Sequence, residues 1–275
     1  MNPREGYGVA IDLGATNLRA AIGTIDCKVI AKKSESTDTS GGPEAISSQI
    51  IKMVKDLQAV LHLQPNNLRG IGIGAIGPLD TRRGGIDNPP NLPGYRFIPL
   101  VEPLTTEFRV AVNLLNDCVA GVVGERTVGP GASEENLAYI TISTGIGCGV
   151  YVDGHLLLGK DGNAHEVGHV VIDHQGKLLC GCGKRGHWEA YCSGRNLPNY
   201  ARMILEGDQQ SLEESILDAY TGGDLSKLTA RMIYDGAKKG DNTSLRIVEE
   251  TGRLNAIGFA NVVNVYDPAL ISVGG

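Results

Sequence analysis

The chain has 275 residues, a hydrophobic fraction of 41% and a formal net charge of −6 at neutral pH. This length permits two lobes, and the acidic balance with no basic patch excludes a general nucleic-acid surface. The N-terminal letters MNPREGYG lack the pattern of a signal peptide, and no apolar run approaches the roughly 18 residues of a membrane span. We therefore expect a cytoplasmic protein without a membrane segment.

The first predicted element is a β-hairpin with a polar glycine turn, GVAIDLGATNLRAAIGTID (8–26). Apolar residues at helical spacing predict a helix over 43–61, and strands are expected over 70–78 and 110–117, with a helix over 118–128. The second strand ends in Asn116 and Asp117. This order of elements is typical of α/β lobes, and we place the hinge near residue 113, with lobes over 1–112 and 113–275.

A second hairpin of the same construction follows, LAYITISTGIGCGVYVDG (137–154), which indicates an internal duplication. The turns contain Gly14, Thr16 and Asn17 in the first hairpin and Ser143, Thr144 and Gly145 in the second. Backbone N–H groups and hydroxyls at such turns suit a polyphosphate. The rest reads as a β-branched run over 170–172 typical of a strand, helices over most of 197–257, and a closing apolar strand, ALISVGG.

The letters HEVGH (165–169) match the helical zinc-protease motif, in which both histidines bind the metal. His165 and His169 share a face only if the segment is helical. Turn-forming residues precede it, Gly168 lies inside it and β-branched residues follow. We therefore disfavour a metalloprotease, and we expect His165→Ala to change neither metal content nor stability.

A glycine-rich segment carries Cys180, Cys182 and His187, and two thiols with an imidazole suit tetrahedral zinc once a fourth ligand is added. A metal-free turn with reduced thiols is the alternative. A site closed by four protein ligands has no open position for water and would be structural.

Seven segments occur in the order and spacing of the ROK family of sugar kinases and sugar-responsive repressors, which the chain resembles over nearly its whole length. They are DLGATN (12–17), GIGAIGP (72–78), NLPGY (91–95), LLNDC (114–118), STGIGCG (143–149), EVGH (166–169) and CGCGKRGHWEAY (180–191). The resemblance implies a two-lobed, actin-like and hexokinase-type α/β fold with duplicated ribonuclease H-like domains. In the family, helical residues normally follow the glycine pair Gly274 and Gly275, so by this resemblance we expect either a fragment that lacks the C-terminal part of the large lobe or an unusual terminus.

By this resemblance Asp117 is the catalytic base, and it also contacts the sugar; a helix N-cap is the alternative explanation on local grounds. Asp12 would hold Mg²⁺ or its waters near the phosphates, and the alternative is a turn-capping aspartate. The residues implied to bind ATP are Asp12, Gly14, Ala15, Thr16, Asn17, Thr144, Gly145, Gly274 and Gly275.

The residues implied to bind sugar hydroxyls are Asn91, Asn116, Asp117, Glu166, His169 and Glu189. A solvated loop residue is the alternative for Glu166, and a helix start for Glu189. The implied structural zinc ligands are His169, Cys180, Cys182 and His187. The family has cysteine where this chain has His187, and Cys192 is a possible substitute ligand.

The sequence thus predicts an ATP-dependent hexose kinase, most simply a glucokinase, that requires Mg²⁺ and forms a homodimer as its family implies. An N-acylhexosamine kinase or a fructokinase of the same family is the nearest alternative. A sugar-sensing repressor is disfavoured, because the eleven residues before Asp12 cannot hold a helix-turn-helix module.

Overall fold

The computed structural model of the chain describes residues 6–92 and 94–275. Contacts between Cα atoms divide it into two compact units. Unit 1 contains the described residues up to Ser133 together with Leu156–Ala164, and unit 2 contains Glu134–His155 and His165–Gly275. A unit defined by contacts is not a hinge of motion, so the lobe boundary expected near residue 113 stays a prediction.

Unit 1 is built on a mixed sheet with strand order β3-β2-β1-β4-β8. The strands are β1 (Tyr7–Leu13), β2 (Asn17–Thr24), β3 (Val29–Ser36), β4 (Leu68–Ala75) and β8 (Val112–Asn116). The hairpin partners β1 and β2 are antiparallel, whereas β4 runs parallel to both β1 and β8. Leu13, Ala75 and Asn116 are in register at the carboxyl ends of the parallel strands. The residues that follow these ends therefore lie along one edge of the sheet.

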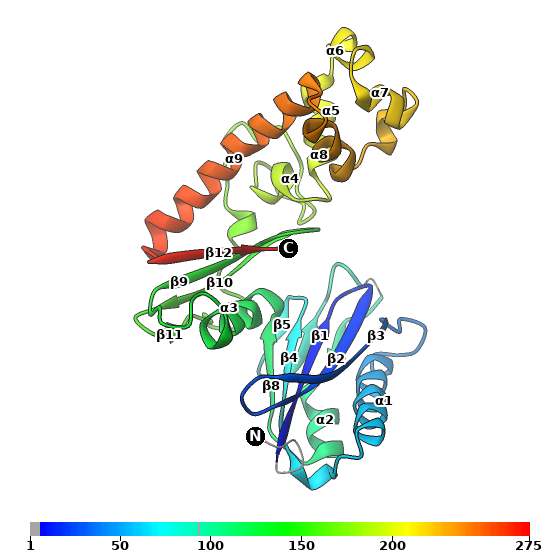
Figure 1. The fold of residues 1–275 in the computed structure, drawn as a ribbon, viewed down its shortest axis with the longest axis vertical. Helices are drawn as coiled ribbons and strands as arrows, with labels where there is room; N and C mark the ends of the chain where they lie inside the picture. Colours follow the sequence, from blue (N-terminus) through cyan, green and yellow to red (C-terminus); the bar gives the residue numbers. More distant parts are fainter. Residues whose placement is uncertain (1–5, 93) are drawn as a thin grey trace. The chain divides into compact units, whose positions relative to one another are not determined.

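Helix α1 (Ala45–Val60) confirms the predicted helix, and it buries Ile46, Ile50 and Met53 completely. It packs against β2 and β3, and α2 (Val101–Phe108) packs against α1 and β8 (Figure 1). Helix α3 (Asp117–Val128) follows β8 directly and packs against β4. The remaining elements of unit 1 are η1 (Pro65–Asn67) and a small antiparallel sheet of β5 (Leu79–Asp80), β6 (Gly85–Asp87) and β7 (Phe97–Pro99).

Unit 2 repeats the arrangement on a sheet with strand order β11-β10-β9-β12. Its strands are β9 (Leu137–Ile142), β10 (Ile146–Val152), β11 (His155–Leu156) and β12 (Leu270–Gly274). As in unit 1, the first hairpin is antiparallel and a later strand joins its first strand in parallel. The predicted duplication is therefore confirmed in the strand topology.

The other elements of unit 2 are helical. They are η2 (Val167–His169), α4 (Glu189–Cys192), α5 (Leu197–Leu205), α6 (Gln209–Glu213), α7 (Ile216–Thr221), η3 (Leu225–Lys227), α8 (Ala230–Lys238) and α9 (Asn242–Tyr266). Helix α9 contacts α4, α5 and α8 and leads into β12 (Figure 1). None of the helices in the described part of the chain combines the length and the hydropathy of a membrane-spanning segment.

The expected strand over 170–172 is wrong. Val170 and Val171 are 40% and 53% exposed, and Val171 makes only an isolated bridge to His187. Local β-propensity does not form a strand where no ladder of partners continues on either side.

Candidate functional site

The first glycine turn, between β1 and β2, is fixed by its own backbone and by Thr37. Gly14 N donates to Asn17 O at 2.9 Å, Thr37 N donates to Thr16 O at 2.9 Å, and the Thr37 hydroxyl donates to Gly14 O at 2.8 Å. Thr16 and Asn17 are exposed at the turn. These hydrogen bonds engage the carbonyls of Gly14, Thr16 and Asn17 and fix the conformation of the turn.

Two aspartates lie at the same edge of the sheet of unit 1, at the ends of β1 and β8. Asp117 opens α3, while the N-cap is Asn116, whose Oδ1 accepts from Cys118 N at 3.0 Å. The N-cap alternative for Asp117 is thus wrong by one residue. Gly74 permits the close approach of this helix, because a Cβ there would lie 3.1 Å from Ala120 Cβ.

The carboxyl group of Asp117 is accessible to solvent, yet protein atoms surround it closely enough to limit its hydration. This desolvation raises its pKa above the ordinary value of 3.8, and repulsion from Asp12 adds to the rise, whereas hydrogen bonds from Cys118 oppose it. A carboxylate with a raised pKa is a better acceptor for a hydroxyl proton. The environment of Asp117 therefore suits a general base.

Asp12 forms an ion pair that we did not anticipate from the sequence. Arg19 Nη1 lies 2.6 Å from Asp12 Oδ2, and both side chains are more than half exposed. The two residues face each other because Asp12 and Arg19 are partners in the β1–β2 register. That cross-strand pairing was a usable signal in the sequence once the hairpin turn had been located.

Asn91 lines a concavity of about 490 Å³ together with Ala15 of the first glycine turn. Tyr95 closes one side of it, since its hydroxyl contacts Thr39 O at 2.9 Å and Gly41 O at 3.0 Å. A predicted sugar residue and a predicted phosphate residue thus share one hollow of unit 1. The described residues that line it are Ala15, Thr39, Asn91, Leu92, Gly94 and Tyr95.

The second glycine turn, in unit 2, is held in a similar way. Ser143 N donates to Gly145 O at 2.9 Å, and Gly194 N donates to Ser143 O at 2.7 Å. Parallel pairing of β12 with β9 puts Gly274 beside Thr141, just before this turn, and a Cβ on Gly275 would lie 2.3 Å from Ile142 O. The fold therefore gathers the implied ATP residues of unit 2 around one turn.

The HEVGH segment is not an α-helix. His165 has a left-handed φ of 67°, and only Val167–His169 forms a short 3₁₀ helix, η2. His165 is buried against Tyr266, whereas His169 Nε2 lies 3.8 Å from Glu166 Oε2. The two histidines do not belong to one metal cluster, so the rejection of the protease interpretation is confirmed.

The four implied zinc ligands do come together. One ligand atom from each of them lies within 4.8 Å of all the others, with Cys180 Sγ 3.6 Å from His169 Nδ1 and Cys182 Sγ 3.3 Å from His187 Nδ1. Tetrahedral zinc with two sulfur and two nitrogen ligands places neighbouring ligand atoms about 3.3–3.8 Å apart. The residues present therefore fit such an ion with little adjustment.

Protonation in the metal-free chain agrees with this fit for the imidazole. Desolvation and the neighbouring His169 lower the pKa of His187, which favours its neutral, ligating form. Burial raises the pKa of Cys180 to about 11, so this thiol would need a cation to become a thiolate. Cys192 lies outside the cluster, with its Sγ 3.8 Å from Thr251 O.

Glu189 is the first residue of α4, and its carboxylate is directed at the second glycine turn. Its Oε2 accepts from Ile146 N at 2.9 Å. The helix-start alternative is therefore correct for the position of Glu189 and does not account for its carboxylate. The role of Ile146 was not predicted from the sequence, because it contacts Glu189 through its backbone N–H group and every residue except proline has such a group.

A further residue missed in the sequence is Asn163, in the part of unit 1 that follows β11. Its side chain pairs with both backbone groups of Leu79, accepting from N and donating to O at 2.8 Å each. This pairing fixes the loop that leads from unit 1 to His165. An asparagine between turn residues gave no signal beyond loop formation.

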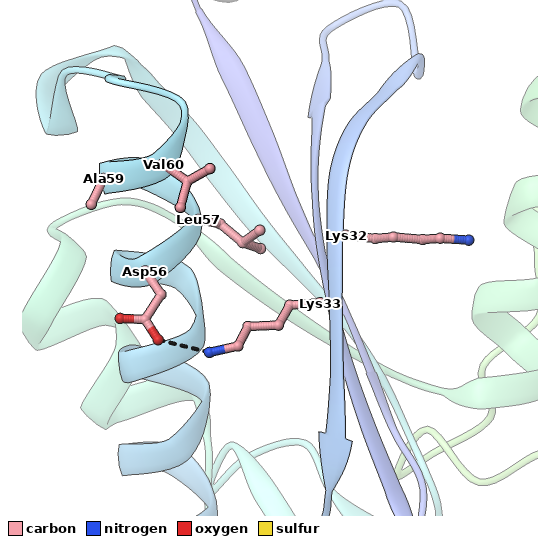
Figure 2. A pocket seen from close by; sticks show the side chains of 6 residues that line it. All are labelled: Lys32, Lys33, Asp56, Leu57, Ala59 and Val60. Atoms are coloured by element: carbon pink, nitrogen blue, oxygen red, sulfur yellow. Dashed lines mark hydrogen bonds and ion pairs between the residues drawn. The ribbon is translucent and has the colours of Figure 1, made fainter.

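A second concavity of unit 1, of about 540 Å³, lies between β3 and the end of α1. Figure 2 shows Lys33 directed at Asp56, with Nζ 2.7 Å from Oδ2, and Lys32 extending from the opposite face of the strand. Lys33 also pairs with Glu35 at 2.8 Å. Within this groove Lys33 and Asp56 are paired with each other, and none of its lining residues belongs to a motif.

Comparison with known proteins adds to this picture. The model of the ROK family matches residues 8–275. A glucokinase of Aeropyrum pernix is 36% identical over 97% of this chain and 81% of its own length, and one of Pyrobaculum calidifontis is 37% identical over 97% and 78%. A ROK family glucokinase from Streptomyces griseus, solved with glucose and AMPPNP, matches 98% of this chain and 83% of its own with a TM-score of 0.76 and 27% identity. The α/β fold is thus that of ROK glucokinases, and the chain belongs to the ROK family.

Proposed function

We propose that this protein phosphorylates glucose on its 6-hydroxyl group with ATP as the phosphoryl donor. The observation that carries the proposal is the pair of carboxylates at one edge of the unit 1 sheet, an accessible Asp117 with a raised pKa and an exposed Asp12. Phosphoryl transfer to a hydroxyl needs both a proton acceptor and a charge that holds the metal of the nucleotide. The glucokinase relatives and the glucose complex described above support glucose as the acceptor.

In the proposed reaction Asp117 accepts the proton of the sugar 6-hydroxyl group. At the same time the oxygen of that hydroxyl group forms a bond to the γ-phosphorus of ATP. The bond from that phosphorus to the bridging oxygen breaks, and ADP leaves with the electron pair. Asn91, Asn116, Glu166, His169 and Glu189 would orient the sugar through its other hydroxyls. The residues that would bind the nucleotide, as the family resemblance implies, are Gly14, Ala15, Thr16, Asn17, Thr144, Gly145, Gly274 and Gly275. Mg²⁺, when bound near Asp12, would neutralise phosphate charge.

We also propose that His169, Cys180, Cys182 and His187 hold a structural Zn²⁺. Their spacing supports this, and the closed donor set leaves no position for a substrate. The His169 ring would then bind zinc through one nitrogen and belong to the sugar site through the other, since its Nε2 is directed at Glu166. A homodimer and a cytoplasmic location stay predictions from the family resemblance.

The proposal is tested by assaying the purified chain with ATP, Mg²⁺ and a panel of glucose, mannose, fructose, N-acetylglucosamine and N-acetylmannosamine. We expect glucose 6-phosphate and ADP in equal amounts, with the highest kcat/KM for glucose. A higher kcat/KM for an N-acylhexosamine or fructose would reassign the substrate within the family. Sugar binding without turnover on any member of the panel would contradict the kinase.

A further inference from the structure

The backbone of Ile146 is contacted on one side by Glu189, which is assigned above to the sugar, and on the other side by η2, which carries the assigned residue His169. On one side its N–H donates to Glu189 Oε2 at 2.9 Å. On the other side η2, which ends in His169, lies so close that a Cβ on Gly168 would be 2.2 Å from Ile146 O. Ile146 directly follows the second glycine turn and is itself buried. Two segments that carry implied sugar ligands therefore contact Ile146, the residue that directly follows the implied phosphate-binding turn.

The composition of the turn reflects this contact. A Cβ on Gly145 would lie 2.6 Å from Glu189 Oε2, so any larger residue would displace the carboxylate from the Ile146 N–H. Gly145 is not among the described glycines with positive φ, and its backbone conformation therefore does not require glycine. The space taken by the Glu189 carboxylate does require it.

Contacts between the residue before Glu189 and helix α9 fix the position of Glu189. The preceding residue, Trp188, is fully buried, its Nε1 donates to Asn255 Oδ1 at 2.8 Å, and its ring meets Phe259 edge to face. After α4 the chain returns to the turn, where Gly194 N donates to Ser143 O at 2.7 Å. The segment from Trp188 to Gly194 thus holds the turn at both ends, once by a side chain and once by the backbone.

We propose that Glu189 is a positioning residue which couples sugar binding to nucleotide binding through the Ile146 N–H. Its Oε2 orders the turn at Thr144 and Gly145. Its Oε1, which lies 3.8 Å from Cys180 Sγ, would accept a sugar hydroxyl that fixes the orientation of the same carboxylate. A ligand that orders a group needed by a second ligand lowers the entropic cost of the second binding event. This inference rests on the proposed function.

Three variants separate the contact from the rest of the site. Glu189→Ala removes the carboxylate, Glu189→Gln keeps an oxygen that can accept from Ile146 N, and Gly145→Ala keeps the carboxylate but occupies its place. Glu249→Ala is the control for the glutamate, because Glu249 is exposed on α9. Gly252→Ala is the control for the added methyl group, because nothing lies within 4 Å of a Cβ at that position.

The measurement is the dissociation constant of AMPPNP with and without saturating glucose, by calorimetry on the full chain. Fluorescence gives a second readout, because the chain has a single tryptophan, Trp188, next to Glu189. We expect glucose to tighten AMPPNP binding about 5-fold or more in the wild type, in Glu189→Gln and in both controls. The factor should fall to about one in Gly145→Ala and Glu189→Ala.

Each outcome decides between the two proposals. A wild type that neither phosphorylates any hexose nor binds AMPPNP refutes the proposed function. A wild type that phosphorylates glucose without any coupling overturns the inference about Glu189. So does a wild-type coupling factor in Gly145→Ala with normal thermal stability. If Glu189→Ala does not fold, Gly145→Ala and Glu189→Gln still decide, because both retain a polar group at residue 189.

Discussion

The ring of His165 stands edge to face against Tyr266, with its Nδ1 3.1 Å from the phenol oxygen and the two ring planes at 72°. His165 therefore belongs to the packing between η2 and the end of α9, while His169, four positions later, belongs to the metal cluster. The two histidines of the HEVGH segment therefore have different roles, one in packing and the other in the metal cluster.

We predict that His169→Ala abolishes zinc binding, whereas His165→Ala retains about one zinc per chain. The burial of His165 changes the expectation that this variant is fully neutral, and we now expect it to lose stability through lost packing. Elemental analysis gives the metal content, and urea unfolding gives the stability. Equal loss of zinc from both folded variants would show that His165 is also needed for metal binding and would contradict this assignment.

Asp117→Asn should lower kcat by about 100- to 10,000-fold, because an amide keeps the shape of the carboxyl group and cannot accept the proton. Binding of glucose should persist, as measured by calorimetry. Glu102→Gln, an exposed change on α2, serves as the control and should retain full turnover. Near-normal turnover of Asp117→Asn would remove this residue from the mechanism.

The same variant should be more stable than the wild type at neutral pH. Desolvation raises the folded-state pKa of Asp117 above 3.8, so the folded protein binds this proton more tightly than the unfolded chain does. Ionisation of Asp117 therefore lowers the free energy of unfolding of the wild type. This loss is absent at pH values below 3.8, grows as pH rises through 3.8, and is complete above the raised folded-state pKa. Unfolding of both proteins by urea between pH 4 and pH 8 should give stability curves that diverge as pH rises. Parallel curves would show that the folded-state pKa is not raised.

Arg19→Gln should lower the Mg²⁺ concentration that gives half-maximal rate, by up to about 5-fold. Arg19 forms an ion pair with one carboxylate oxygen of Asp12, and both side chains are exposed. Exposed ion pairs of this kind contribute at most about 1 kcal/mol of interaction free energy. Removing the competing cation should strengthen the attraction of Asp12 for the metal by a similar amount. A rise in the KM for ATP with an unchanged Mg²⁺ requirement would indicate instead that Arg19 acts on the phosphates.

The elements that sequence patterns located are those whose signal is local. Apolar spacing identified α1, and turn glycines between apolar runs identified both hairpins. Strand β3 was missed because its residues alternate between exposed and half-buried and include Lys32 and Lys33, which resemble a solvated loop. The short α2 was missed because Pro103 interrupts its pattern.

The candidate site shows the same division. Side chains with distinctive chemistry, such as Asp117, Cys180 and Cys182, were identifiable by type and by the family motif. The Glu189 contact to Ile146 joins residues 43 positions apart through a backbone group, and only the fold brings them together. The pairing of Asn163 with Leu79 spans 84 positions in the same way.

The discontinuity of unit 1 has a consequence for how the protein is made. The loop Leu156–Ala164 belongs by its contacts to unit 1, although the hairpin of β9 and β10 precedes it in the chain. A ribosome must therefore release that hairpin before Asn163 can reach Leu79, so the N-terminal unit cannot finish folding first as an uninterrupted domain would. If translation paused between residues 134 and 164, unit 1 would be incomplete, and the backbone N–H and C=O groups of Leu79 would lack their hydrogen bonds to Asn163.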